Sequence, residues 1–179
     1  MWLVEAMRRL LGKLVLRPPE FSNHPGLTRR MVLIACNTAL EFDIYGNVNS
    51  THVAGTKMMN GIGGSGDFAR NACYTIFVTK SYAKGGKLSS VVPMVTHHDH
   101  TEHDVDILIT ERGLADLRGL APRERAKVII ENTTHPDYKE ILRDYAKEAA
   151  STAGGQTPQM LSKAFFLHER FAETGSMLP

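Results

Sequence analysis

The chain has 179 residues, of which 42% are hydrophobic and 22% are charged. This length suits one domain with a full core and is too short for two, and the composition is that of a globular protein. A net charge of +2 argues against nucleic acid or an anionic membrane as a partner. No apolar run reaches the roughly 18 residues that cross a bilayer, and residues 1–16 lack the features of a signal peptide. We therefore expect a cytoplasmic protein in which Cys36 and Cys73 are reduced and buried.

The apolar pattern predicts a mixed sheet with helices gathered towards the C-terminal end. An amphipathic helix over residues 2–11 comes first and should pack on another element, and Pro18 ends it. The expected strands are residues 31–36, 39–44, 74–79, 89–92 and 105–110. The first strand is apolar throughout, as in a sheet that is covered on both faces. The pattern becomes helical after Glu111, and the expected helices are residues 122–130, 136–148 and 159–173.

A glycine cluster lies near the middle of the chain, with five glycines in the sixteen positions of residues 55–70. Regular helices and strands disfavour so many glycines. The cluster leads into a short helix that Ser65 or Asp67 could cap, so its free N–H groups could bind an anion or a developing oxyanion. The spacing is neither that of a dinucleotide fingerprint nor that of a P-loop. From spacing alone, a ligand-binding loop and a turn that only permits close packing are even alternatives.

Three further features could carry chemistry. Residues 96–104 contain four histidines and three acidic residues, but their spacing matches no metal motif, so we expect a solvated or ion-paired loop without metal. Lys84 lies in a basic glycine loop that could bind a phosphate or could simply be solvated. Glu111 ends a strand, a position at which α/β enzymes often place catalytic or binding residues. It could have such a role, or it could simply form an ion pair with Arg112 or Arg118.

Three motifs, at residues 46–53, 60–68 and 110–126, resemble the acetyl-CoA hydrolase/transferase family, and within it the acetate/succinyl-CoA CoA-transferases. They follow the family's order, and the likeness extends from about residue 13 to about residue 150. The resemblance implies an α/β fold with a single domain, built as a three-layer α/β/α open mixed sheet of the NagB/CoA-transferase-like type. The expected parts are an amphipathic helix over 1–16 that is atypical for the family, the family's C-terminal domain over 17–153, and a linker with a helix over 154–179.

The same resemblance gives roles to five residues. Asn60, Gly64 and Lys84 match positions that bind coenzyme A in the family, where the N–H of Gly64 would donate to the thioester oxygen. Glu111 matches a glutamate that shapes the carboxylate pocket, and Asn23 matches a further active-site position. Coenzyme A is thus expected as a co-substrate, and no permanently bound cofactor is expected.

The family's reaction resembles a ping-pong exchange, in which a glutamate attacks the acyl-CoA and a glutamyl-CoA thioester then passes CoA to a second carboxylate. In the family this glutamate lies well before the position of Arg17, where the chain has only Glu5, in dissimilar surroundings. We therefore expect the C-terminal half of a CoA-transferase or acetyl-CoA hydrolase for acetyl-CoA or succinyl-CoA and short carboxylates. Alone it should be inactive, and a separate N-terminal half could complete it.

The alternative is a catalytically inactive CoA-binding or oligomerisation domain, a truncated remnant without the nucleophile. In either case we expect apolar surface around the first helix, and hence homo-oligomers.

Overall fold

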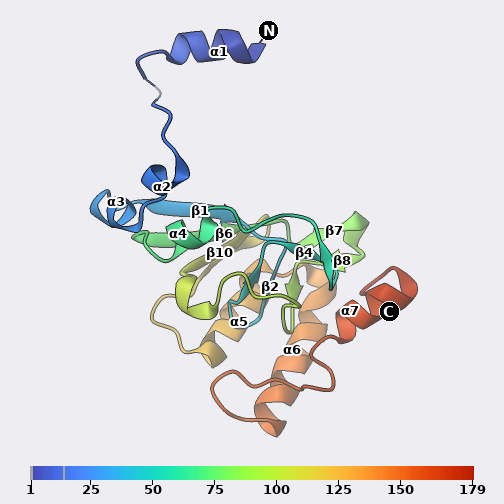
Figure 1. Cartoon of the computed structure of the whole chain (residues 1–179). Coiled ribbons are helices and arrows are strands. Elements are labelled where there is room, and N and C mark those ends of the chain that lie inside the picture. The colour runs from blue at the N-terminus through green and yellow to red at the C-terminus, as the bar shows by residue number, and fades with distance from the viewer. Residues whose placement is uncertain (1, 14) are drawn as a thin grey trace.

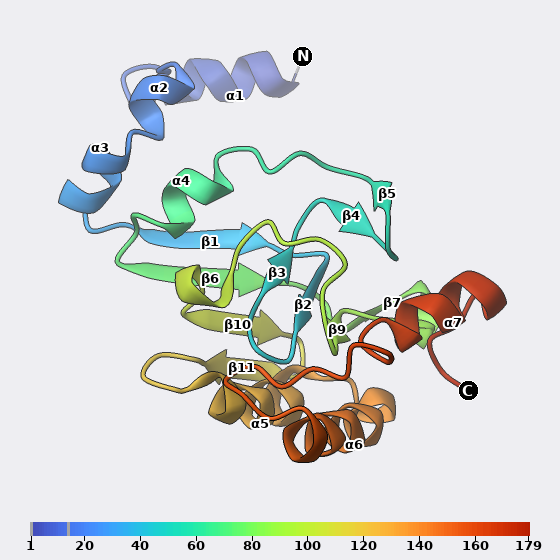
Figure 2. The same cartoon turned by 60° about the horizontal axis from the view of Figure 1, so that its bottom comes forward.

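A mixed four-stranded sheet forms the centre of the computed structural model, which describes residues 2–13 and 15–179. In spatial order its strands are β1 (Ile34–Thr38), β6 (Tyr74–Val78), β10 (Ile107–Thr110) and β11 (Gly113–Asp116). The first three run parallel, whereas β11 pairs antiparallel with β10. Figure 2 shows the strands in this order, with helices α5 (Pro122–Thr133) and α6 (Pro136–Thr152) beyond β11. The α/β class, the mixed sheet and both helices were predicted and are confirmed.

Smaller elements surround this sheet. A second sheet contains β3 (Val48–Asn49), β2 (Glu41–Asp43) and β9 (Val91–Val92). Two hairpins consist of β4 (His52–Val53) with β5 (Lys57–Met58), and β7 (Tyr82–Ala83) with β8 (Leu88–Ser89). The remaining helices are α1 (Trp2–Leu10), α2 (Pro19–Ser22), α3 (Pro25–Arg30), α4 (Ser65–Ala69) and α7 (Phe166–Thr174).

The hydrophobic core lies on one face of the central sheet. Phe77, Leu108 and Ala115 lie side by side on β6, β10 and β11 and are fully buried. Ile129 of α5 and Phe42 of the second sheet belong to the same buried cluster. Successive residues of a strand point to opposite faces, so these buried side chains share one face of the central sheet. The hydrophobic core of the domain packs against that face.

The opposite face of the central sheet is largely open. On it, Ile34 is 61% exposed, Leu114 is 47% exposed, and Tyr74 and Val78 are each 39% exposed. Within the described residues, no second helical layer covers this face. The expectation that the first strand is covered on both sides is therefore wrong. The prediction that the two cysteines are buried is also wrong, because both are exposed free thiols. Cys36 lies on the open face of the sheet.

The first helix forms where the sequence predicts it, but its expected packing partner is missing from the described part of the chain. Val4, Met7 and Leu10 are 44–55% exposed. Figure 1 shows α1 standing apart from the remaining elements. No helix among the described residues is long and apolar enough to span a membrane.

Several predicted element boundaries are wrong. The strand expected at residues 31–36 is β1, which begins only at Ile34, and residues 89–92 are divided between β8 and β9. Residues 113–116 form strand β11 rather than a helix, because Glu111 and Arg112 make a tight hairpin in which Thr110 pairs with Gly113. The last helix begins at Phe166 rather than near Gln159. Residues 159 and 160 are instead bound to the hydroxyl of Tyr145, which receives a hydrogen bond from the Met160 N–H at 3.1 Å.

We expect Leu108→Ala to lower the free energy of unfolding by about 2–5 kcal/mol, since it leaves a cavity in the core. Ile34→Ala should change it by less than about 0.5 kcal/mol, since the Ile34 side chain is already mostly in water. Denaturant unfolding of the two variants measures the difference. A cost for Ile34→Ala close to that for Leu108→Ala would contradict the one-sided core.

Candidate functional site

The carboxyl ends of three parallel strands meet at one edge of the central sheet, and a hollow of about 630 Å³ lies there. Thr79 and Lys80 follow β6, and Glu111 follows β10. These three residues line the hollow together with Leu40 and Lys84. We call it the Glu111 hollow. Its position is the one at which open α/β sheets usually bind ligands.

The carboxylate of Glu111 is held in place by two neighbours. It accepts hydrogen bonds from the Ser81 backbone N–H at 2.7 Å and from the Ser81 hydroxyl. The Nε atom of Arg112 lies 3.2 Å from its Oε1. Burial opposes ionisation, but these donors outweigh it and keep the pKa of Glu111 below its usual value. Glu111 therefore presents an ionised carboxylate at neutral pH, and of its two expected ion-pair partners it contacts Arg112, whereas Arg118 pairs with Asp116.

Lys84 lies at the junction of three hollows. Besides the Glu111 hollow, it lines one of about 240 Å³, the connecting hollow, and one of about 440 Å³, the Phe171 hollow. Its backbone has φ = +51°, which is unusual for a residue with a side chain. The Tyr138 hydroxyl donates to the Gly86 carbonyl at 2.6 Å and fixes this loop from α6. The Nζ atom of Lys84 lies 4.6 Å from the centre of the Phe171 ring.

Gly64 and Asn23 are in direct contact. Gly64 directly precedes α4, and a methyl group placed on it would lie 2.3 Å from Nδ2 of Asn23. Such a close approach explains why a glycine stands here. The prediction that Ser65 or Asp67 caps α4 is wrong, because neither side chain makes that contact. The Ser65 hydroxyl instead bonds to the Ile62 carbonyl at 2.8 Å and to Nε2 of His100 at 3.0 Å.

The structure thus brings four of the five predicted residues into two groups. Asn23 and Gly64 form one, and Lys84 and Glu111 form the other, across the Glu111 hollow. Asn60 belongs to neither, and its side chain donates to the Ser50 carbonyl at 3.4 Å. Of the five residues, Asn60 and Gly64 lie in the glycine cluster.

The position of His100 differs from the one expected from the sequence. Part of the loop is ion-paired as expected, with Nε2 of His97 lying 3.4 Å from the Asp99 carboxylate. His100, however, is 1% exposed and lies with its ring 4.8 Å from that of Phe77. Burial lowers the pKa of His100 despite the nearby charges of Asp99 and Asp104, which favours the neutral imidazole. Within the described residues, no three His, Cys, Asp or Glu side chains are placed to share a metal ion.

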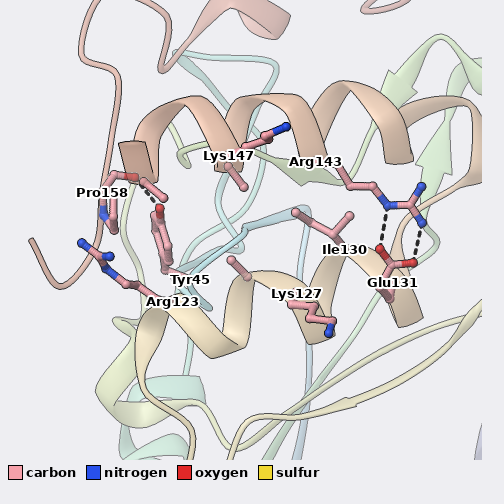
Figure 3. Close-up of a pocket in the computed structure, with 11 residues that line it drawn as sticks. Tyr45, Arg123, Lys127, Ile130, Glu131, Arg143, Lys147 and Pro158 are labelled. Carbon is pink, nitrogen blue, oxygen red and sulfur yellow. Dashed lines mark hydrogen bonds and ion pairs between the residues drawn. The ribbon is translucent and has the colours of Figure 1, made fainter. Parts of the chain in front are cut away.

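A separate groove of about 260 Å³ lies between α5 and α6. Figure 3 shows its basic rim, where Glu131 receives a 2.6 Å hydrogen bond from Arg143 and where Lys127 and Lys147 lie on opposite helices. None of the five predicted site residues lines this groove. The groove between α5 and α6 therefore contains none of the residues that we expect to bind coenzyme A or the carboxylate.

Comparison with known proteins finds a match between residues 3–146 and the model of the acetyl-CoA hydrolase/transferase C-terminal domain. The chain is 64% identical over 165 residues to a succinyl-CoA:acetate CoA-transferase of Clostridium kluyveri, covering 92% of the chain and 31% of that protein. It is 55% identical to a propanoyl-CoA:succinate CoA transferase of Escherichia coli, covering 93% of the chain and 33% of the relative. An acetyl-CoA hydrolase of Schizosaccharomyces pombe is 47% identical, with 92% and 33% covered. The chain thus spans about a third of the length of these curated relatives.

Solved structures agree with this similarity. RipA from Yersinia pestis matches with a TM-score of 0.66 and 31% identity, over 74% of this chain and 31% of that one. A 4-hydroxybutyrate CoA-transferase from Porphyromonas gingivalis matches with a TM-score of 0.58 and 26% identity, over the same shares.

We expect Ser81→Ala to raise the pKa of Glu111 towards its usual value. The substitution removes a hydroxyl donor that stabilises the ionised carboxylate, and such a loss favours the protonated form. Nuclear magnetic resonance titration of labelled glutamate carboxyl groups measures the shift, with Ser65→Ala as the serine control. An unchanged or lower pKa of Glu111 in Ser81→Ala would show that Ser81 does not stabilise the charge.

Proposed function

We propose, since the chain belongs to the acetyl-CoA hydrolase/transferase family, that it supplies the CoA-binding part of a CoA-transferase or acetyl-CoA hydrolase site. The observation that carries this proposal is the shared hollow of Lys84 and Glu111 at the carboxyl edge of the sheet. A lysine and an oriented carboxylate at this edge suit a ligand with phosphate groups and a reactive acyl end.

Each predicted residue has a distinct part in this proposal. The ammonium group of Lys84 binds a phosphate of coenzyme A. The N–H of Gly64 donates to the thioester oxygen as it becomes negative, with the Asn23 amide beside it. Asn60, in the glycine cluster, also binds CoA. Glu111 shapes the pocket for the carboxylate, oriented by Ser81 and Arg112.

The attacking carboxylate, in our proposal, comes from the two thirds of the relatives that this chain does not match. That part would belong to a longer chain or to a separate N-terminal half. The open face of the central sheet supports the proposal, because Ile34, Tyr74 and Leu114 present apolar surface there. The exposed apolar side chains of α1 offer a second contact.

The substrates proposed are short acyl-CoA thioesters, with a short carboxylate or water as the acceptor. The names of the relatives support this class, since they mention acetate, succinyl-CoA, propanoyl-CoA and acetyl-CoA. Coenzyme A is then a co-substrate, and the site needs no permanently bound cofactor. A cytoplasmic location is also part of the proposal.

An inactive CoA-binding or self-associating domain is the second candidate. The open sheet face favours it too, because a second copy of the chain could cover the same apolar surface. Light scattering on the purified chain separates a monomer from a homo-oligomer.

We expect acetyl-CoA to bind the purified chain without releasing thiol, and Lys84→Ala to weaken binding about tenfold by removing a charged phosphate contact. Lys87→Ala is the matched control, because Lys87 lies in the same loop but lines none of the three hollows. Calorimetric titration measures binding, and a thiol reagent follows turnover in the same samples.

Addition of the N-terminal two thirds of a relative, as a separate polypeptide, should bring about thiol release if the enzymatic proposal is right. Binding without release in that mixture would favour the inactive domain. Absence of acetyl-CoA binding by the chain would overturn the proposed function.

A further inference from the structure

We propose that the Phe171 hollow binds the adenosine 3′-phosphate end of the acyl-CoA, with the adenine ring packed against Phe171. The inference rests on the proposed function and adds the α7 segment to the site. Helix α7 lies beyond residues 3–146, which match the family's domain model. The family match therefore gives α7 no role.

The lining of the Phe171 hollow has the chemistry of a nucleotide site. Two cations, Lys57 and Lys84, line it, and no acidic side chain does. The remaining surface comes from the Phe171 ring, from two small residues, and from Met58 and Met59, which are 65% and 66% exposed. Lysines suit phosphate groups, whereas an aromatic ring and flexible thioethers suit the face of a flat base.

The hollow also continues towards the predicted reactive region. The connecting hollow shares Val53, Ala54 and Met59 with the Phe171 hollow, and it shares Leu40 and Ser90 with the Glu111 hollow. Lys84 lines all three. A long ligand with phosphates near one end could therefore place them at Lys84, its base beyond them against Phe171, and its arm in the connecting hollow.

Independent contacts fix the two sides of the Phe171 hollow. On the α7 side, His168 lies 2.8 Å from the Glu41 carboxylate, and both side chains are 5% exposed. After α7, the Met177 N–H donates to the Lys87 carbonyl at 2.8 Å and ties the C-terminal segment to the Lys84 loop. Since ring and ammonium are positioned before any ligand arrives, binding would cost little reorganisation.

A purely structural role is the competing explanation, in which the Lys84 to Phe171 contact only anchors α7. The two explanations differ in their prediction for Lys57. Its side chain is exposed and lies on β5, across the hollow from α7. Removal of its charge should leave α7 in place but weaken a phosphate ligand.

The test is calorimetric titration of the full chain with acetyl-CoA and with adenosine 3′,5′-bisphosphate. Phe171→Ala should weaken both ligands about tenfold, as expected for loss of an aromatic ring beside a base. Phe171→Tyr should keep the affinity within about twofold, and Lys57→Gln should weaken both ligands several-fold. Phe21→Ala is the matched control, because Phe21 also has a cation over its ring, that of Arg17 at 5.9 Å, but lines none of the three hollows.

Unchanged affinity for acetyl-CoA in Phe171→Ala or in Lys57→Gln would overturn the inference and leave the proposed function intact. Bisphosphate binding that depends on Phe171, without acetyl-CoA binding, would support the nucleotide site and overturn the proposed function. If neither ligand binds the native chain, both the proposed function and this inference are overturned. Thermal melting identifies any variant that has lost its fold. If Phe171→Ala is unfolded, the affinity of Lys57→Gln decides between the two explanations.

Discussion

A single buried carboxylate joins the parts of the fold on which the site depends. Glu41 on β2 accepts hydrogen bonds from Asn49 at 3.0 Å and from the N–H and hydroxyl of Thr96 at 3.1 Å each, and it lies 2.8 Å from Nε2 of His168. Burial opposes its ionisation, but these donors outweigh it and lower the pKa of Glu41. A buried charge is tolerable only with such a full set of partners. Glu41 thereby fixes α7, and with it the Phe171 ring, to the second sheet.

The central sheet shows a different constraint, because only one of its faces is packed. Phe77 and Leu108 on that face are fully buried, whereas Ile34 and Tyr74 on the other remain accessible. Removing apolar surface from water contributes roughly 25 cal/mol per Å², so an open apolar face favours association. The same parallel strands that leave this face open also bring Glu111 to the carboxyl edge. The open apolar face and the Glu111 hollow thus depend on the same parallel strands.

Much of the fold could be predicted from the sequence, because periodicity and proline positions mark strand β6 and the starts of α5 and α6. Strand β11 was missed, since a two-residue turn followed by four residues gives no periodic signal of its own. Burial was the main failure: an apolar run such as residues 31–36 does not reveal how many layers will cover it. The pairing of Glu41 with His168, 127 positions apart, has no local signature, and neither has the approach of Phe171 to Lys84.

The polar stretch of residues 96–104, in which we expected a solvated or ion-paired loop without metal, also fixes residues 59–65 of the glycine cluster at both ends. The Asp99 carboxylate accepts hydrogen bonds from Ser50 and from the Thr51 hydroxyl, each at 2.8 Å. The Thr51 carbonyl in turn accepts from the backbone N–H of Met59, at the start of the loop, at 2.8 Å. At the far end, His100 bonds to Ser65, directly after Gly64. The adjacent residues Asp99 and His100 therefore position the two ends of this glycine-rich segment. This fixation allows a flexible sequence to present its N–H groups in one arrangement, as an oxyanion site requires.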